Sequence, residues 1–598
     1  MKSENRMRFR RSVSILGVIF LIGATVLFLK RSNPLVDLTL SNPLTHDSDA
    51  PNLPISTESH PIARLISQAE ISFKTIQTRQ SSSLKEAVAE YRRRYRAPPP
   101  PGFDKWYKYA KKKGVQIIDE YDTIYHSLLP FWALEPAVLR ERTREAIGFD
   151  NAMIAVMIRD GKVTKIEGGG DGAEWHRNAT RDMLQGFVHY LPDMDLAFNV
   201  HDEPRVVLQH DDLTRYVRIA TNVSIPLAYN NPQLSNKWSS RPADLGDGTR
   251  IEEYKTTRFN RFAHQPTWTT SRLSCSPESA ARSLSEPAED NFTSYTSSPL
   301  GFVENTTAFS DICNSPSLQH TFGFFDRPNA FDVTHDLFAI FSQSKISSFQ
   351  DIIYPSPWYW AGRVVYDHWK DYGWSRKNGT LYWRGTTTGG FSRDGSWRRQ
   401  HRQRFVQKVN ALDMTLRLEH NSSLDSEGAW FQKEISRQDM KDKFDVHFTG
   451  IGQCDPGDCA AQNEYFELAP PVDMNDAYKY KYLLDMDGNA FSGRYYAFLL
   501  SKSLVYKLAI FREWHDEWLK AWVHYIPLSW KGDEYVESVR YFDQEEIGKT
   551  QAKKVAEQGR DWAGKVLRNE DLEVWYFRLL LEYGRLVDDD RYNIGYTT

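Results

Sequence analysis

Residues 479–507, KYKYLLDMDGNAFSGRYYAFLLSKSLVYK, predict a strand, a glycine-containing loop, a short helix and a second strand. Residues 480–486 form a mostly apolar run that ends in a turn signal, which is typical of a buried strand. Gly488 and Asn489 supply the turn, and residues 495–500 suit a short helix. Such a βαβ unit places its loop at the carboxyl edge of a parallel sheet, where backbone N–H groups and the helix dipole face any anion.

Arg494 falls in the first turn of that helix, and its planar guanidinium suits phosphate oxygens. We interpret residues 488–494 as a loop that holds a phosphate-bearing donor, with Gly488, Ser492, Gly493 and Arg494 as the candidate donor-binding residues. On this segment alone the alternative stays open that the glycine only makes a turn and the arginine only forms a surface ion pair.

Two further segments carry polar side chains at the predicted ends of strands. Residues 384–393, RGTTTGGFSR, follow a strand at 379–383, and their candidate donor-binding residues are Arg384, Gly385, Thr386 and Arg393. Residues 199–204 begin at the end of a predicted strand at 195–200 and contain Asp202, our candidate general base. Together with 488–494, these segments could meet in a cleft between two α/β domains. Asp202 could instead only cap its turn, and Arg384 could form a structural ion pair.

This combination predicts transfer of a sugar from a nucleotide donor. The diphosphate leaving group gains negative charge, which arginines and loop amides can stabilise. The acceptor hydroxyl needs a base, and one base attacking opposite the leaving group inverts the anomeric centre. Asp485 and Asp487 form an Asp-x-Asp pair of the kind that binds a metal and a diphosphate in many glycosyltransferases, so a divalent cation such as Mn²⁺ is possible. Solvated or capping carboxylates are the alternative.

The N-terminus carries a targeting signal. Five basic residues precede the apolar run 13–29, and no small-residue cleavage site follows it, which predicts an uncleaved membrane anchor with the N-terminus in the cytosol and the rest of the chain in the lumen of the Golgi or ER. Residues 30–62 are rich in Pro, Ser, Asn and Asp, as in a flexible stem. Residues 63–101 are predicted to be a helical, basic end of that stem.

Other features agree with a lumenal chain. The four cysteines pair most simply by sequence proximity as Cys275–Cys313 and Cys454–Cys459, although a zinc site is a competing reading. The six N-glycosylation sequons are at Asn178, Asn222, Asn291, Asn305, Asn378 and Asn421. The C-terminal residues 596–598 carry no retrieval tetrapeptide, so retention would rest on the anchor.

With 598 residues the chain is too long for one core. The net charge of −3 does not point to nucleic acid as a partner. We expect a cytosolic tail at 1–12, an acceptor-side α/β domain at 102–345 with a Ser/Pro-rich insertion at about 236–314, a nucleotide-sugar-binding α/β domain at 346–545 and C-terminal helices at 546–598. Tyr354, Trp358, Tyr359 and Trp360 could form an acceptor or sugar wall, or they could pack in the core.

The chain resembles glycosyltransferase family 90, which includes the fungal capsule-associated proteins, among them β-1,2-xylosyltransferases, and the animal Rumi-like protein O-glucosyltransferases. The resemblance lies in ordered blocks between about residues 102 and 583, namely NVHDEP at 199–204, DIIYP at 351–355, LYWRGT at 381–386 with Arg393 and Asp394, residues 478–507 and WVHYIP at 522–527.

The resemblance implies a GT-B architecture of two Rossmann-like domains facing a cleft, a UDP-sugar donor and an inverting mechanism. It assigns Asp202 as the base and places Thr386, Arg393 and Arg494 around the diphosphate, with Ser492 nearby. Rumi-like members have serine at the position of Thr386, have a loop one residue shorter before the second arginine, and lack the Asp-x-Asp pair.

Rumi-like members are also soluble and carry a retrieval tail. The predicted anchor therefore favours the fungal branch, with UDP-xylose as donor and a glycan as acceptor. Two alternatives remain: a protein O-glucosyltransferase that acts on Ser or Thr, and a non-catalytic sugar-binding protein of the same fold.

Overall fold

The computed structural model describes residues 59–283, 288–297, 300–420 and 430–597. The predicted anchor at 13–29 and nearly all of the predicted stem lie outside these residues. Among the residues described, no helix is both long and apolar enough to cross a membrane. The described residues all belong to one compact unit, 50–598.

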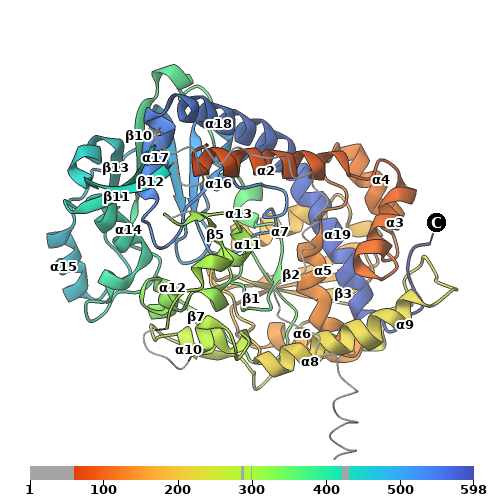
Figure 1. The fold of residues 1–598 in the computed structure, drawn as a ribbon. Coiled ribbons are helices and arrows are strands. Elements are labelled where there is room, and N and C mark those ends of the chain that lie inside the picture. Colours follow the sequence, from red (N-terminus) through yellow and green to blue (C-terminus); the bar gives the residue numbers. More distant parts are fainter. Residues whose placement is uncertain (1–58, 284–287, 298–299, 421–429, 598) are drawn as a thin grey trace, which may run out of the picture. The chain divides into compact units, whose positions relative to one another are not determined.

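Two five-stranded sheets organise the fold, which confirms the α/β class (Figure 1). The first sheet has the order β2-β1-β3-β8-β9 and the second has the order β13-β10-β14-β15-β16. The first comprises β1 Met153–Arg159, β2 Lys162–Gly168, β3 Met194–Asn199, β8 Ile340–Ser342 and β9 Ile352–Ile353; the second comprises β10 Asn378–Thr386, β13 Phe444–Gly450, β14 Tyr480–Met486, β15 Leu504–Leu508 and β16 Ile526–Pro527.

The first sheet is mixed, because β1 and β2 form the hairpin that the Asp160-Gly161 dipeptide predicts. Both turn residues have positive φ, 50° at Asp160 and 70° at Gly161, as a type I′ turn requires. Strand β1 is also antiparallel to β3, whereas β3, β8 and β9 run parallel. The first sheet therefore departs from an all-parallel Rossmann pattern on the hairpin side, and only β3, β8 and β9 share a carboxyl edge.

All strand pairs of the second sheet are parallel. Its central strand β14 is apolar and buried along most of its length, as a strand covered on both faces must be. The turn after β14 leads into α16 Tyr495–Leu500 and then β15, so the βαβ unit predicted from residues 479–507 is present.

Helices cover both sheets. Helix α18 packs against α16 and α17, whereas the almost entirely buried α19 packs against α4, α6 and α7 beside the first sheet. The longer helices are α2 Pro61–Thr78, α3 Leu84–Tyr95, α4 Phe103–Lys113, α5 Asp122–Leu128, α6 Pro136–Gly148, α7 Glu174–Leu184, α8 His210–Ile219, α14 His401–Val409, α15 Pro456–Tyr465, α17 Tyr535–Gln544, α18 Glu546–Val566 and α19 Asn569–Val587.

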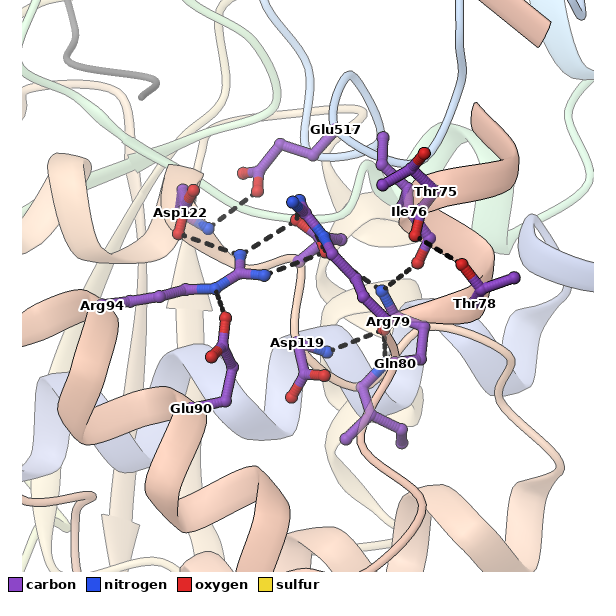
Figure 2. A network of polar contacts seen from close by, with 12 residues as sticks. Thr75, Ile76, Thr78, Arg79, Gln80, Glu90, Arg94, Asp119, Asp122 and Glu517 are labelled. Atoms are coloured by element: carbon purple, nitrogen blue, oxygen red, sulfur yellow. Dashed lines mark hydrogen bonds and ion pairs between the residues drawn. The ribbon is translucent and has the colours of Figure 1, made fainter. Parts of the chain in front are cut away.

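The last residues of the predicted flexible stem, 59–62, and the predicted stem end, 63–101, instead pack into the folded body. Ile62 of α2 is fully buried in the core that includes the second sheet, and His60 lies 2.9 Å from Glu537. Figure 2 shows Arg94 of α3 between Glu90 and Asp122, at 2.6 Å and 3.6 Å. The prediction of a stem failed because α2 and α3 each bury one apolar face against the folded body. The basic composition of this segment did not reveal those faces.

The network in Figure 2 also ties the N-terminal helices to the region after β15. The backbone N–H of Asp122 donates to Glu517 at 2.7 Å, and that of Asp119 donates to Gln80 Oε1 at 3.0 Å. Burial raises the pKa of Glu517 to about 8, and the neighbouring Asp122 carboxylate contributes. Residues 76–122 thus connect to the second half of the chain by buried polar contacts.

Within its described residues, the Ser/Pro-rich insertion forms five short strands or α-helical turns, besides 3-10 turns. They are β4 Asn260–Phe262, α10 Trp268–Ser271, β5 Thr296–Ser297, β6 Phe302–Val303 and α11 Thr306–Phe309. Strand β4 pairs with β7 Phe331–Val333, which brings the insertion next to the first sheet.

Candidate active site

The two loops predicted to bind phosphate meet at the carboxyl edge of the second sheet. The loop after β10 and the loop after β14 are joined by a hydrogen bond from Gly389 N to Asn489 Oδ1, at 3.2 Å. A Cβ on Gly488 would lie 2.9 Å from Arg402 Nη2, so glycine permits the close approach of a guanidinium to this loop.

Arg494 and Arg402 reach the end of β10 from two directions. Arg494 Nη1 donates to the carbonyl of Arg384 at 2.6 Å, and Arg402 Nη1 donates to the carbonyl of Thr386 at 3.1 Å. Arg402 Nε also donates to the carbonyl of Asp487 at 2.9 Å, so one side chain contacts both loops. Among the described residues, Nη2 of each arginine has no hydrogen-bond acceptor.

The electrostatics at this edge favour an anion. Burial lowers the pKa of Arg402 to about 9, and the nearby positive charge of Arg494 lowers it further. Burial also raises the pKa of Asp487 to about 7, so this carboxyl neutralises the arginines only in part at neutral pH. Two guanidinium groups with free donors and incomplete neutralisation form a site for a doubly charged group such as a diphosphate.

The other predicted donor residues have structural partners. Arg384 forms an ion pair with Asp445 at 2.6 Å, which is the structural alternative left open from the sequence. Its backbone carbonyl, and not its side chain, contacts Arg494. Arg393 forms a solvent-facing ion pair with Asp455 at 2.5 Å. Gly385 lies in β10 itself.

Thr386 is exposed at the end of β10, where its Oγ1 lies 3.1 Å from Thr388 Oγ1. Arg402 Nη1 donates to that same Thr388 hydroxyl at 2.8 Å. Both hydroxyls therefore lie beside the guanidinium and can donate to the same anion.

Asp485 and Asp487 are held by protein partners. Asp485 Oδ2 lies 3.2 Å from Lys507 Nζ, and Asp487 Oδ2 accepts from the N–H groups of Ile510 and Phe511 at 2.7 Å and 3.3 Å. The remaining oxygen of each has no partner within the described part of the chain. In that part no three His, Cys, Asp or Glu side chains gather as metal ligands would.

Asp202 lies at the carboxyl end of β3 in a firmly held turn. Asn199 Nδ2 donates to the carbonyl of Glu203 at 2.8 Å, and Asn199 Oδ1 accepts from His201 N at 3.0 Å and Arg205 Nε at 2.6 Å. The side chain of Asp202 itself is exposed to solvent and has no hydrogen bond or ion pair with any described residue.

The surroundings of this turn make Asp202 a stronger base. Crowding by protein raises the pKa of Asp202 although its carboxylate still faces solvent. The adjacent Glu203 is buried, its pKa is raised to about 8, and it accepts from Ala330 N at 3.0 Å. Burial and the charge of Arg205 lower the pKa of His201 to about 4, so it is neutral at pH 7. Asp202 is thus an unpaired carboxylate that can accept a proton.

Short contacts connect the Asp202 turn to the loop after β10. On the side of the turn, Ala330 N donates to the Glu203 carboxylate. On the side of the loop, the carbonyl of Arg327 accepts from Phe391 N at 2.7 Å, and Arg327 Nη1 donates to the carbonyl of Arg393 at 3.1 Å. Residues 327–330 therefore contact both the Asp202 turn and the loop after β10.

A second connection joins the carboxyl edges of the two sheets. After β8, Lys345 exchanges two backbone hydrogen bonds with Arg512, which follows β15, at 3.1 Å and 2.8 Å. The chain that follows β8 at the carboxyl edge of the first sheet is thus in contact with the chain that follows β15 at the carboxyl edge of the second.

The predicted aromatic wall divides into two pairs. Tyr354 is fully buried in the core, where its hydroxyl lies 2.8 Å from His176 Nε2, so for this residue core packing is the correct reading. Trp360 packs at the edge of the same core and its carbonyl accepts from Asn569 Nδ2 at 3.3 Å. Neither position suits a sugar wall at the donor loop.

Trp358 and Tyr359 instead contact the donor loop directly. Trp358 Nε1 donates to the carbonyl of Gly493 at 3.1 Å, and the Tyr359 hydroxyl donates to the carbonyl of Ser492 at 3.0 Å. The Tyr359 ring stacks on Tyr496 with centroids 3.6 Å apart. Because both side chains bridge from the first sheet to 492–493, they position the donor loop.

The structure joins Cys275 to Cys313 and Cys454 to Cys459, the pairing predicted from sequence proximity. Of the sequons, Asn222, Asn291, Asn305 and Asn378 are exposed. Asn178 is half-buried in α7 and the hydroxyl-bearing Thr180 of its sequon is fully buried, which disfavours glycosylation of the folded chain there. Asn421 lies outside the described residues.

Sequence reasoning missed Arg402. It lies in a basic run, RRQHRQR, which gives no sign of a buried guanidinium. The signal was its spacing, because Phe405, Val406 and Val409 follow at the third, fourth and seventh positions and place Arg402 on the apolar face of α14. The preceding His401, also missed, is neutral because burial lowers its pKa to about 3, and its Nε2 lies 2.9 Å from the carbonyl of Asp487.

Residues 323–591 match the family model Glycosyl transferase family 90. This span, a little under half of the chain, is thus similar to a glycosyltransferase family 90 domain. The matched span includes both loops of the second sheet and Arg402, and it begins after the Asp202 turn.

Similar curated proteins carry related names. The chain is 35% identical over 127 residues to O-glucosyltransferase rumi of Drosophila pseudoobscura pseudoobscura, covering 20% of this chain and 30% of that protein. It is 24% identical over 305 residues to human Protein O-glucosyltransferase 1, covering 47% of this chain and 64% of that protein. The matches thus span less than two thirds of either relative.

Proposed function

We propose that this chain is an inverting glycosyltransferase that moves a sugar from a UDP-sugar to an acceptor hydroxyl in the secretory pathway. The observation that carries the proposal is an unpartnered carboxylate, Asp202, at the carboxyl end of β3, linked through residues 327–330 to the loop of a two-arginine anion site at the carboxyl edge of the second sheet. The meeting of the two carboxyl edges supports a GT-B-like arrangement, in which the donor binds the second sheet and the acceptor binds the first.

In the proposed reaction, Asp202 accepts the proton of the acceptor hydroxyl. The hydroxyl oxygen forms a bond to the anomeric carbon as the bond from that carbon to the UDP oxygen breaks, and UDP leaves with the electron pair. Arg494, Arg402 and the loop amides stabilise the charge that develops on the diphosphate. Because attack and departure are on opposite faces, the anomeric configuration inverts.

The family resemblance favours UDP-xylose as donor and a glycan as acceptor. The names of the similar proteins favour a second candidate, transfer of glucose to a serine or threonine of a protein. Both candidates use the same base and the same anion site, and they differ in the donor sugar and in the acceptor.

A panel of UDP-sugars offered to the purified full-length chain tests the proposal, with release of UDP and transfer as the readouts. Turnover that Asp202→Asn abolishes while UDP still binds supports an enzyme. A wild-type chain that turns over none of the donors would instead be a non-catalytic sugar-binding protein. Repeating the assay with a chelator and with added Mn²⁺ measures any dependence on a divalent cation.

We also propose a single-pass membrane protein with its catalytic part in the lumen of the Golgi or ER. The two disulfides support an oxidising compartment, and the exposed sequons are compatible with one. Protease protection of residues 59–598 in sealed microsomes, together with a shift in mass after glycosidase treatment, tests this topology.

A further inference from the structure

The insertion contributes a strand, β4, that borders the Asp202 turn. Strand β4 pairs with β7 in register, with Phe262 opposite Phe331. On its other side, the chain at β7 pairs with the residues that follow Asp202, because Thr334 N donates to Arg205 O at 2.9 Å. Residues 260–262 are therefore only one strand away from the chain that leaves the candidate base.

The same segment reaches the donor side two residues later. The ring of His264 stacks on that of Phe391, with centroids 3.6 Å apart and planes inclined by 2°. Phe391 belongs to the loop after β10, two residues before Arg393. His264 has a φ of 50°, a left-handed conformation that the surrounding structure must hold in place. Residues 260–264 thus run from the Asp202 turn to the donor loop.

This stretch presents amphipathic chemistry to solvent. Phe262 remains 38% exposed, and the side chain of Arg261 is 63% exposed. Beside His264, the ion pair between Arg393 and Asp455 also faces solvent, with side chains 44% and 39% exposed. Flat ring faces bordered by charged donors and acceptors match a sugar ring, which has a C–H face and a rim of hydroxyls.

We propose that residues 260–264, together with Phe391 and the Arg393–Asp455 pair, form a subsite for a sugar unit of the acceptor. His264 supplies the stacking face, and Arg261, Arg393 and Asp455 contact the hydroxyls. The subsite extends from the reacting hydroxyl along the insertion. This inference rests on the proposed glycosyl transfer and makes the insertion a determinant of acceptor choice.

The test uses the full-length chain and the methyl glycosides of xylose, glucose, mannose and galactose as probes. Saturation-transfer NMR in the presence of UDP reports sugar binding without turnover. A second assay compares transfer to each glycoside with hydrolysis of the UDP-sugar by water. The variants are His264→Ala, His264→Phe, which keeps a ring, and Gln265→Ala, a control at the exposed next position.

We expect His264→Ala to weaken glycoside binding and to raise the KM for the glycoside about threefold to tenfold, the effect of losing one aromatic contact. Hydrolysis of the donor should not change, and His264→Phe and Gln265→Ala should behave like the wild type. Glycoside binding that depends on His264 in a chain without turnover would uphold the subsite and reject the proposed function.

Three results would overturn the subsite. The first is a wild-type chain that binds no glycoside, and the second is a His264→Ala variant that binds glycosides as the wild type does. The third is an equal loss of transfer and of donor hydrolysis, which would make His264 a support of the donor loop.

Discussion

Replacing Asp202 by Asn should abolish transfer without destabilising the protein. The carboxylate has no partner among the described residues, so the substitution breaks no contact there. A general base contributes about 10²- to 10⁴-fold to the rate, or roughly 3–5 kcal/mol of transition-state stabilisation. We therefore expect kcat to fall by that factor while UDP binding, measured by calorimetry, is retained.

The effect on stability has a definite sign. Since the folded-state pKa of Asp202 is raised above its unfolded value, the folded protein binds more protons than the unfolded chain between the two pKa values. The ionised carboxylate therefore costs stability as pH rises through that window, and the cost persists at pH 7. Asp202→Asn removes it, so the free energy of unfolding at pH 7 should stay within about 0.5 kcal/mol or rise.

Asp351→Asn is the matched control, because it makes the same chemical change at a fully buried carboxylate. Asp351 accepts from Arg205 N, Val206 N and the Ser342 hydroxyl at 2.7–3.1 Å. Its substitution should lower the free energy of unfolding by about 1–3 kcal/mol for each group left unpaired. A Tm loss for Asp202→Asn as large as that control's, or unchanged turnover, would refute the assignment of Asp202 as the base.

Three further substitutions test the donor side and the insertion. Arg402→Lys cannot reproduce the planar fork and should weaken UDP binding about tenfold to a hundredfold, whereas Arg398→Lys in the same basic run should not; titration with UDP distinguishes them. Gly493→Ala would place a Cβ 2.4 Å from Trp358 Nε1, so it should displace the indole and reduce donor turnover, with tryptophan fluorescence as a second readout. Cys275→Ser opens a bridge of sequence separation 38 and should cost about 2–4 kcal/mol, seen as a lower Tm.

Much of the second sheet could be predicted from the sequence because its strands are short apolar runs bounded by turn residues. The predicted strand at 480–486 matches β14. In the first sheet, the Asp160-Gly161 dipeptide marks the turn between β1 and β2. Strands β8 and β9 were missed, since runs of two or three residues carry no periodicity. Arg402 was missed because its role depends on two loops that are 100 residues apart in the sequence at Gly389 and Asn489.

The aromatic residues of 354–360 show why residue type alone could not distinguish a ring that lines the site from a ring that packs in the core. Tyr354 and Tyr359 are five residues apart, yet one hydroxyl meets His176 in the core and the other meets the donor loop. What separates them is α13, Pro357–Trp360, which turns the chain from the end of β9 toward residues 492–493. A single helical turn separates the two rings. Ser356 and Pro357 mark its start in the sequence, but they do not indicate which ring is buried.

The base and the anion site come from different sheets, so catalysis by this arrangement depends on how the two edges are held together. The Lys345–Arg512 backbone pair and the hydrogen bond from Trp358 to Gly493 fix that relation with a few short contacts. Neither contact includes Asp202 or the free donors of Arg402. Loss of the Lys345–Arg512 pair should therefore lower kcat through misplacement, while the affinity for UDP, set within the second sheet, is preserved. Loss of the Trp358 contact should also weaken UDP binding, because that contact holds the donor loop.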